Sequence, residues 1–540
     1  MRRALLLVLL VAAAQVAPAA PAHAAKSSYG DYVKAARAIE DWRYDEAHTL
    51  VDTLTRQSPD DPETRYLQAQ LAFLDGDYAR AKGILDKLDA PSVKPLVRDL
   101  APLVSSTLDA TRGMQSKVSK GGHFEIFFHP GKDELLVDLA GNVLEAAYTQ
   151  ITADVGYAPP GKVRVEILER VSDLARVSPL TERAIETSGT IALCKYNKLM
   201  IVTPRATLTG YAWMDTLAHE FTHYLVTRAT HDKVPIWLHE GLAKYEESRW
   251  RAEPGATGMG RINEHLLAMA LKKGRLITFE EMHPSMALLP SQEAAATAFA
   301  EVYAFVAYLH TKVGYPGIRA MLERIRDGRT ERRAIAEVLG VSWEDAQATW
   351  KKYLKALPLR LSPALAARGG GHKIRLKKSE GDDENVGVET IAQDKAKNHA
   401  RLGGLLRARG RLGAAASEYE KALAVTGPND VFLASKLART YLELGAPEKA
   451  IAVIEAIPDR DEEDAGPETT LGAAYLETRD MAKAELHLSA ALRVQPFDPA
   501  VRCGLAEVYT AAGREADAER EKNACRVARS GPGADHGRTK

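Results

Sequence analysis

A repeat of 34 to 35 residues runs through the last quarter of this 540-residue chain and limits its fold more than any other feature. The repeat is clearest in four alanines spaced 35, 34 and 34 residues apart: Ala415, Ala450, Ala484 and Ala518. Glycine or arginine stands five residues before each of them, at a position suited to a turn. A period of this length is typical of helix pairs that stack into a solenoid, with small residues allowing close approach.

The N-terminal part of the chain shows the same spacing. Tyr44 and Ala47 recur 34 residues later as Tyr78 and Ala81. Both stretches resemble tetratricopeptide repeats, which implies all-α solenoids at residues 26–118 and 395–530 and a protein partner bound by them. Ordinary helical hairpins without solenoid stacking are the alternative for each stretch.

Residues 119–358 have a different, mixed pattern. Apolar and polar residues alternate at 124–129 and 162–168, as they do in half-buried strands, and a helical pattern at 134–155 separates the two. Residues 189–194 and 199–202 form a predicted hairpin. We therefore expect an α+β domain between two solenoids, separable from both because linkers bound it.

Directly after this hairpin comes a His-Glu-x-x-His sequence formed by His219, Glu220 and His223. Residues four apart project from one face of a helix, one turn from each other. Two imidazoles so placed can hold one Zn²⁺, with Glu220 beside a water on the same ion.

A catalytic zinc site usually has three protein ligands, so a third is needed. The metzincin pattern would require glycine and histidine where this chain has Val226 and Ala229. Glu240 is a candidate on a second predicted helix that begins near Pro235, because it lies off that helix's apolar stripe. Gly241 should then allow this helix to approach the first one closely.

Together these two motifs resemble the gluzincin metallopeptidases, specifically the peptidase MA-like branch of the thermolysin superfamily. The resemblance covers residues 122–357. It implies a thermolysin-like zincin fold, one zinc held by His219, His223 and Glu240, and Glu220 as the general base of peptide hydrolysis. His239 and His231 are the next candidates for the third ligand.

The resemblance also bears on substrate binding. It assigns residues 189–194 to an edge strand that pairs with the substrate backbone. The Gly-x-Met-Glu-Asn motif of related aminopeptidases is missing here, which favours an endopeptidase. Tyr303 is the candidate donor to the oxyanion, although an aromatic residue on an apolar helix is more often part of the core.

One position departs from the thermolysin pattern. An aspartate four residues after the glutamate ligand normally orients a ligating histidine, and here that position is Lys244. Three acidic residues could take its place: Asp215, Glu246 and Glu247.

The chain ends and the linkers have patterns of their own. Residues 1–25 combine two arginines, an apolar run and a small-x-small end, which predicts a secretory signal peptide; a buried N-terminal helix is the alternative. We expect an exported protein, periplasmic or extracellular, with no transmembrane segment after cleavage. A charged linker is predicted at 359–394 and a disordered tail at 531–540.

Charge and cysteine content add two constraints. Lys plus Arg and Asp plus Glu are 72 each, so nothing indicates nucleic acid as a partner. Cys503 and Cys525 could form a disulfide in an oxidising compartment or be small buried residues. The sequence therefore predicts a zinc endopeptidase with protein-binding repeats. The alternative is a non-catalytic repeat scaffold with a vestigial peptidase-like domain.

Overall fold

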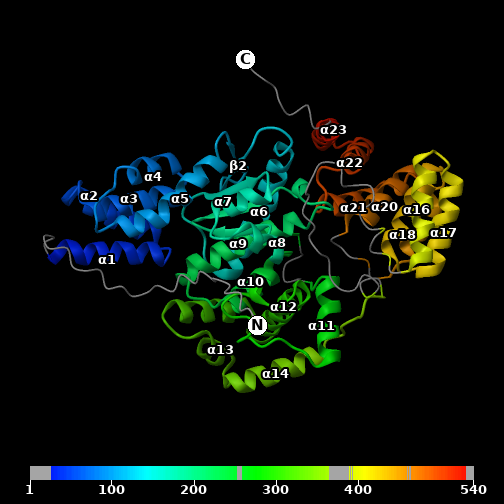
Figure 1. Ribbon diagram of the computed structural model, residues 1–540. Helices are drawn as coiled ribbons and strands as arrows, with labels where there is room; N and C mark the ends of the chain where they lie inside the picture. Colours follow the sequence, from blue (N-terminus) through cyan, green and yellow to red (C-terminus); the bar gives the residue numbers. More distant parts are fainter. Residues whose placement is uncertain are drawn as a thin grey trace, which may run out of the picture. The chain divides into compact units, whose positions relative to one another are not determined.

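The computed structural model describes residues 26–251, 258–363, 393–458 and 464–530, with single residues at 366, 388, 391 and 460 (Figure 1). The predicted signal peptide, most of the predicted linker and the predicted C-terminal tail lie outside these ranges. Contacts divide the chain into two compact units, residues 1–104 and 105–540, which are described separately below. Over the described residues, none of the helices combines the length and apolar character needed to cross a bilayer.

The N-terminal unit is built from antiparallel helix pairs. Tyr44 and Tyr78 begin the second helix of successive pairs, and Ala47 and Ala81 are fully buried where the helices meet. The 34-residue spacing thus places equivalent side chains at equivalent packing positions. The helices are α1 (Lys26–Glu40), α2 (Tyr44–Gln57), α3 (Pro62–Leu74), α4 (Tyr78–Leu85) and α5 (Lys94–Ala110), the last of which runs into the second unit.

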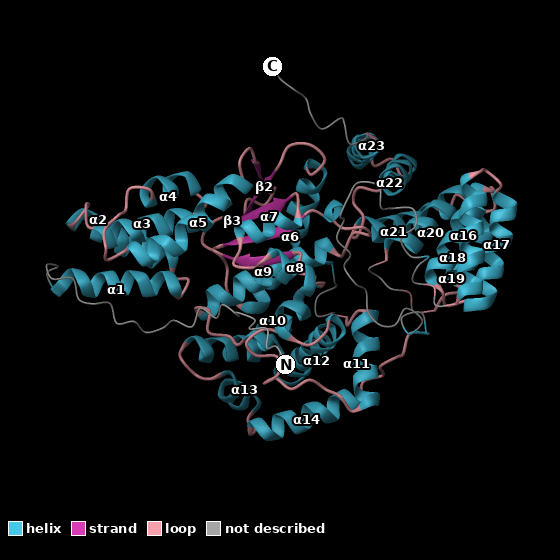
Figure 2. Ribbon diagram, in the orientation of Figure 1, coloured by secondary structure: helices cyan, strands magenta, loops and turns pink. Residues whose placement is uncertain are grey.

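The second unit contains a five-stranded mixed sheet with strand order β1-β2-β3-β5-β4 (Figure 2). β2, β3 and β5 are parallel, while β1 and β4 pair antiparallel at the two edges. β4 is therefore an edge strand, as the sequence predicted for this region. The strands are β1 (Gln115–Val118), β2 (Phe124–Phe128), β3 (Val163–Leu168), β4 (Ala192–Lys195) and β5 (Lys198–Val202).

The edge strand is shorter than predicted. Strand structure was expected from Gly189, but helix α8 (Glu182–Ser188) extends up to that residue and Gly189 caps it in the left-handed conformation. β4 therefore begins only at Ala192. The β4–β5 turn has positive φ at Tyr196 and Asn197, a conformation that matches the twist of a tight hairpin.

A buried ion pair connects two of the parallel strands. The Nζ atom of Lys198 on β5 donates to Oε2 of Glu166 on β3 at 2.7 Å, and both side chains are almost completely shielded from solvent. Burial lowers the pKa of Lys198, and Glu166 opposes that shift. Arg164, on the same face, donates to the other carboxylate oxygen at 2.7 Å. The buried carboxylate is thus paired on both oxygens.

Helices α6 (Glu134–Val155) and α9 (Trp213–Thr230) contact each other and one face of the sheet. The ring of Phe221 on α9 packs edge-on against Phe124 of β2, with centroids 5.0 Å apart. α7 (Val171–Val177) and α8 pack against β3 and β5 around Leu168 and Met200. α9 is therefore held against the sheet along its apolar side.

The remaining helices of the domain form a layer beyond α9. Within it, Trp237, Phe279, Phe305 and Trp350 stack or meet edge-on with centroids 4.2 to 5.4 Å apart. The longest of them, α12, is interrupted at Gly314, which has a positive φ. These helices are α10 (Ile236–Glu246), α11 (Arg261–Lys273), α12 (Gln292–Arg326), α13 (Glu331–Leu339) and α14 (Trp343–Ala356), with single 3₁₀ turns at Pro204–Ala206, Arg249–Arg251 and Met286–Leu288.

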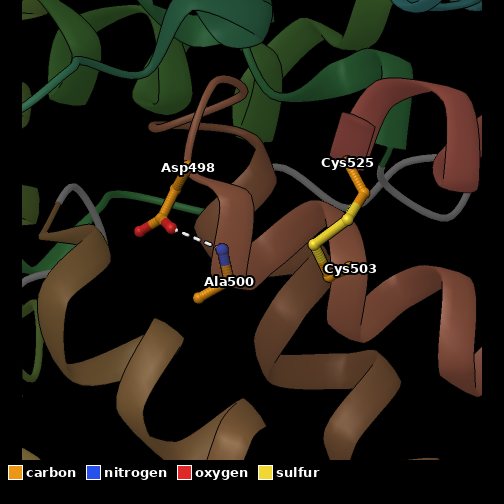
Figure 3. Close-up of a disulfide and its surroundings, with 4 residues drawn as sticks. All are labelled: Asp498, Ala500, Cys503 and Cys525. Atoms are coloured by element: carbon orange, nitrogen blue, oxygen red, sulfur yellow. Dashed lines mark hydrogen bonds between the residues drawn. A yellow bond between two sulfur atoms is a disulfide. The ribbon is translucent and has the colours of Figure 1, made fainter. Parts of the chain in front are cut away.

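The C-terminal solenoid consists of consecutive antiparallel helix pairs. The four alanines of the repeat are 0–2% exposed, as expected for positions where paired helices touch. A disulfide joins Cys503 to Cys525 across the last pair (Figure 3). The helices are α16 (Asp394–Ala408), α17 (Leu412–Thr426), α18 (Val431–Glu443), α19 (Pro447–Glu455), α20 (Ala465–Glu477), α21 (Met481–Leu492), α22 (Pro499–Ala511) and α23 (Glu515–Arg529).

Candidate metal centre

α9 and α10 bring three side chains to one point. His219 and His223 lie one turn apart on α9, and their Nε2 atoms are 3.1 Å from each other. Glu240 on α10 places its Oε2 atom 3.4 Å from the His219 Nε2 and 3.3 Å from the His223 Nε2. These three residues form the candidate metal centre that both sequence motifs predicted.

The spacing of these atoms suits a zinc ion. Ligand bonds of about 2.0–2.1 Å in tetrahedral geometry put neighbouring ligand atoms about 3.3 Å apart, and the three observed separations lie on both sides of that value. Two imidazoles and a carboxylate are also a donor set typical of catalytic zinc. The residues present therefore fit the ion that the motifs imply.

The electrostatics of the centre favour a positive charge. Burial alone would lower the pKa of His219, but Glu240 and Glu247 raise it to about 10. Burial would raise the pKa of Glu240, but His223 and His219 hold it well below its usual range. An environment that holds a proton this strongly also attracts a metal cation in its place.

Glu247 takes the orienting role that an aspartate has in the thermolysin pattern. Its Oε2 atom lies 3.3 Å from Nδ1 of His219, the nitrogen that faces away from the centre. Lys244, which occupies the usual aspartate position, donates instead to Oε1 of Glu247 at 2.5 Å. The lysine thus fixes the acid that orients His219.

The other two acidic candidates have different partners. Asp215 accepts from Nε1 of Trp250 at 2.8 Å and pairs with Arg251. Burial, and then the nearby Asp154, raise the pKa of Glu246 to about 8. Over the described part of the chain, the acid that contacts a histidine of the candidate centre from behind is Glu247, so the structure selects it among the three alternatives left open by the sequence.

His223 is oriented by another histidine. Its Nδ1 atom lies 2.5 Å from Nδ1 of His239, whose Nε2 lies 3.0 Å from Oγ1 of Thr227. If Nε2 of His223 binds a metal, its Nδ1–H donates to His239, which must be neutral to accept. Burial followed by the charge of His223 lowers the pKa of His239 to about 3, which keeps that ring neutral. His239 therefore contacts the candidate ligand His223 on the side away from the centre.

Glu220 lies beside the ligands with one oxygen free of protein partners. Among the described residues, its buried Oε2 atom has no hydrogen-bond partner. Burial raises the pKa of Glu220, and His223 and His219 oppose the shift. The backbone N–H of Cys194 on β4 also hydrogen-bonds this carboxylate. The edge strand and the predicted general base are therefore adjacent.

Tyr303 and His231 were also candidates for this site. Tyr303 on α12 is buried, with its ring 5.5 Å from that of Tyr245, and its role as oxyanion donor stays a prediction. His231 caps the C-terminal end of α9 with a φ of 58°. It follows His223 by eight residues, about 12 Å along a helix, which separates it from the centre.

The prediction for Gly241 was wrong about its neighbour. A Cβ atom there would lie 3.0 Å from the Val302 carbonyl oxygen and from Cγ2 of Val306, both on α12. The glycine therefore allows α10 to approach α12, and the approach to α9 was not what required it. Pro235 also differs slightly, since it is the N-cap residue and the helix starts at Ile236.

Comparison with known families agrees with this geometry. Residues 145–356 match the model of the Peptidase MA superfamily. Residues 406–466 match one tetratricopeptide repeat model, and residues 32–91 and 469–534 match another. The sequence matches none of the curated proteins.

Three solved structures show a weak likeness to this chain. The Cut9–Hcn1 hetero-tetramer of the APC/C shares 12% identity over 93% of this chain and 79% of that chain, with a TM-score of 0.26. Yeast LTA4 hydrolase in complex with bestatin shares 12% over 77% and 66%, with a TM-score of 0.31. Yeast Tom70 shares 11% over 92% and 88%, with a TM-score of 0.17. From the family matches, the chain carries a Peptidase MA superfamily domain with tetratricopeptide repeats on both sides of it.

Proposed function

We propose that this protein is a zinc-dependent peptidase that holds one zinc ion per chain between His219, His223 and Glu240. The observation that carries the proposal is the set of three donor atoms 3.1 to 3.4 Å apart, beside a buried Glu220 oxygen that has no hydrogen-bond partner within the described ranges. A non-catalytic domain has no need for a buried general base, because burying an unpaired carboxylate is costly.

Each polar residue of the centre has a part in the reaction. A bound zinc ion would lower the pKa of a water ligand to roughly 7 and polarise the scissile carbonyl. Glu220 accepts the proton of the attacking water and returns it to the nitrogen of the leaving amine. Burial raises the pKa of Glu220 above that of an exposed carboxylate, which makes it a stronger base for the first of these steps. Glu247 and His239 hold the two imidazoles in place.

The substrate would be a peptide or protein, cleaved internally. The edge of β4 next to Glu220 offers backbone groups to an added strand. The tetratricopeptide repeats would bring a protein partner or the substrate itself, as such solenoids present extended binding surfaces.

We also propose that the protein is exported. The apolar N-terminal pattern supports this, and so does the disulfide between Cys503 and Cys525, because disulfides persist mainly in oxidising compartments. N-terminal sequencing of the mature protein should find Ala25 or Lys26 first. Recovery from the cytosol with Met1 intact would contradict export.

Metal analysis combined with peptide cleavage tests the enzyme. Alanine at His219, His223 or Glu240 should each remove most of the zinc, while alanine at His129 in the same domain should not. Glu220→Gln should keep the zinc and abolish cleavage of an unfolded protein substrate. An active Glu220→Gln variant would refute the mechanism. Zinc at one ion per chain without any cleavage would favour the non-catalytic scaffold.

A further inference from the structure

The C-terminal solenoid touches the catalytic domain directly at the start of α9. The last residue of α21 and the loop after it accept two hydrogen bonds from the first residue of this helix and the segment before it. The backbone N–H of Tyr211 donates to the Val494 oxygen at 3.3 Å, and Nε1 of Trp213 donates to the Leu492 oxygen at 3.4 Å. Trp213 is the first residue of α9 and precedes His219 by six residues, about 9 Å along the helix.

Gly210 makes this contact possible for two reasons. Its φ is +71°, a conformation that residues with a Cβ rarely adopt. A Cβ atom would also lie 2.1 Å from the Val494 oxygen, far inside any allowed contact. The solenoid backbone therefore occupies the space that a side chain at Gly210 would need.

The same segment is anchored to the sheet. The hydroxyl of Tyr211 donates to the carbonyl of Val202, the last residue of β5. Tyr211 and Trp213 are 2% and 1% exposed, so both rings are enclosed. The entry to α9 is thus fixed on one side by the sheet and on the other by the solenoid.

The last helix pair of the solenoid makes a second contact with the catalytic domain. Arg502 of α22, which is 1% exposed, donates to the Pro496 oxygen at 2.7 Å, to Glu521 at 2.9 Å and to the Leu135 oxygen of α6 at 3.4 Å. Lys132 donates to the Ser530 oxygen just after α23 at 2.9 Å. This pair of helices therefore touches the start of α6 as well.

A disulfide and a helix cap stabilise this helix pair. The Cys503–Cys525 disulfide ties α22 to α23, and Cys503 directly follows Arg502 (Figure 3). Asp498 caps α22 by accepting from the Ala500 backbone N–H at 2.8 Å (Figure 3). Both stabilise the part of the solenoid that contacts the catalytic domain.

We propose that residues 492–496, held by the disulfide-bonded α22–α23 pair, latch the N-terminal end of α9 and so position the turn that carries His219. The C-terminal solenoid is then part of the catalytic unit, which departs from the expectation that residues 119–358 are separable from both solenoids. The expected effect on zinc affinity rests on the proposed function, whereas the contact between the solenoid and α9 does not.

Hydrogen exchange of the full-length, metal-free protein tests the latch. Gly210→Ala should speed the exchange of residues 211–218 by about ten-fold, because a new Cβ must displace the solenoid backbone. Gly274→Ala is the matched control: its φ is +62°, and no atom of the described residues lies within 4 Å of the added Cβ. Equal exchange of residues 211–218 in the two variants would overturn the latch.

A milder variant covers the case in which Gly210→Ala does not fold. Trp213→Phe keeps an aromatic ring but removes the donor to Leu492, and should speed exchange at the start of α9 by a few-fold. Trp350→Phe is its control, since Nε1 of that buried ring has no acceptor among the described residues. No difference between these two variants would also refute the latch.

Zinc binding then separates the latch from the proposed function. In chelator competition, Gly210→Ala should hold zinc about ten-fold more weakly than Gly274→Ala, because the ligand helix is less fixed. Faster exchange with unchanged zinc affinity would confine the latch to a structural role and overturn its positioning of His219. Absence of zinc binding in every variant, with the exchange difference intact, would count against the zinc enzyme and leave the latch standing.

Discussion

Replacing Gly241 with alanine tests how tightly α10 is packed, and two opposing effects decide the outcome. Alanine inside a helix is favoured over glycine by about 1 kcal/mol. The new Cβ, however, would lie 3.0 Å from the Val302 oxygen and 3.2 Å from the Val302 Cβ, atoms that cannot rotate away. Overpacking of this kind costs about 1–3 kcal/mol, so after the gain from alanine is subtracted we expect a net loss of up to about 2 kcal/mol.

Hydrogen exchange of the α10 amides measures this loss locally, which suits a chain with several domains. A loss of about 2 kcal/mol, the upper end of this range, corresponds to exchange roughly 30 times faster. Gly404→Ala in α16 is the control, because its Cβ would meet only the Tyr419 hydroxyl at 3.7 Å and should slow exchange there. Slower exchange of α10 in Gly241→Ala would refute the packing argument.

Three further predictions concern Glu247, the disulfide of the solenoid and Glu246. Glu247→Gln should weaken zinc binding by about 10 to 100-fold in chelator competition, because His219 loses a charged acceptor; unchanged affinity would mean that Glu247 does not orient the ligand. Replacing both Cys503 and Cys525 by alanine should destabilise the solenoid by about 3 kcal/mol, from a loop closed over 22 residues, and an unchanged melting temperature would contradict this. The folded protein keeps a proton on Glu246 up to about pH 8, whereas the unfolded chain loses it near 4.5, so stability should fall as the pH rises across that window. Glu246→Gln should remove this part of the decline in urea denaturation at pH 5 and 9; an identical pH dependence in both proteins would contradict the buried-acid assignment.

Local patterns in the sequence predicted a large part of the fold. The helix at 134–155 has the predicted bounds, and the strands at 124–128 and 163–168 differ from prediction by a residue at one end. These elements are set by apolar periodicity, which depends only on near neighbours in the chain. The ligand geometry was predictable for the same reason, because helical spacing fixes which side chains share a face.

Contacts between distant elements were not predictable in this way. The sequence left three acidic residues as candidates to orient His219, and only the packing of α9 against α10 selects Glu247. Gly241 signalled a close approach, but a glycine carries no information about which helix comes close. Gly210 was not singled out from the sequence, and its partner Val494 lies 284 residues further along the chain.

The ion pair between Glu166 and Lys198 also limits where residues can be inserted into this sequence or deleted from it. Sliding β5 by one residue would turn Lys198 to the opposite face of the sheet and leave Glu166 buried without its ammonium partner. Losing one member of a buried pair costs about 3–5 kcal/mol, enough to reject a misaligned strand during folding. Because the chain runs from β5 through residues 203–212 into α9, this charge pair fixes the place on the sheet from which the segment leading to the helix of His219 departs. Insertions or deletions inside β5 would therefore be selected against.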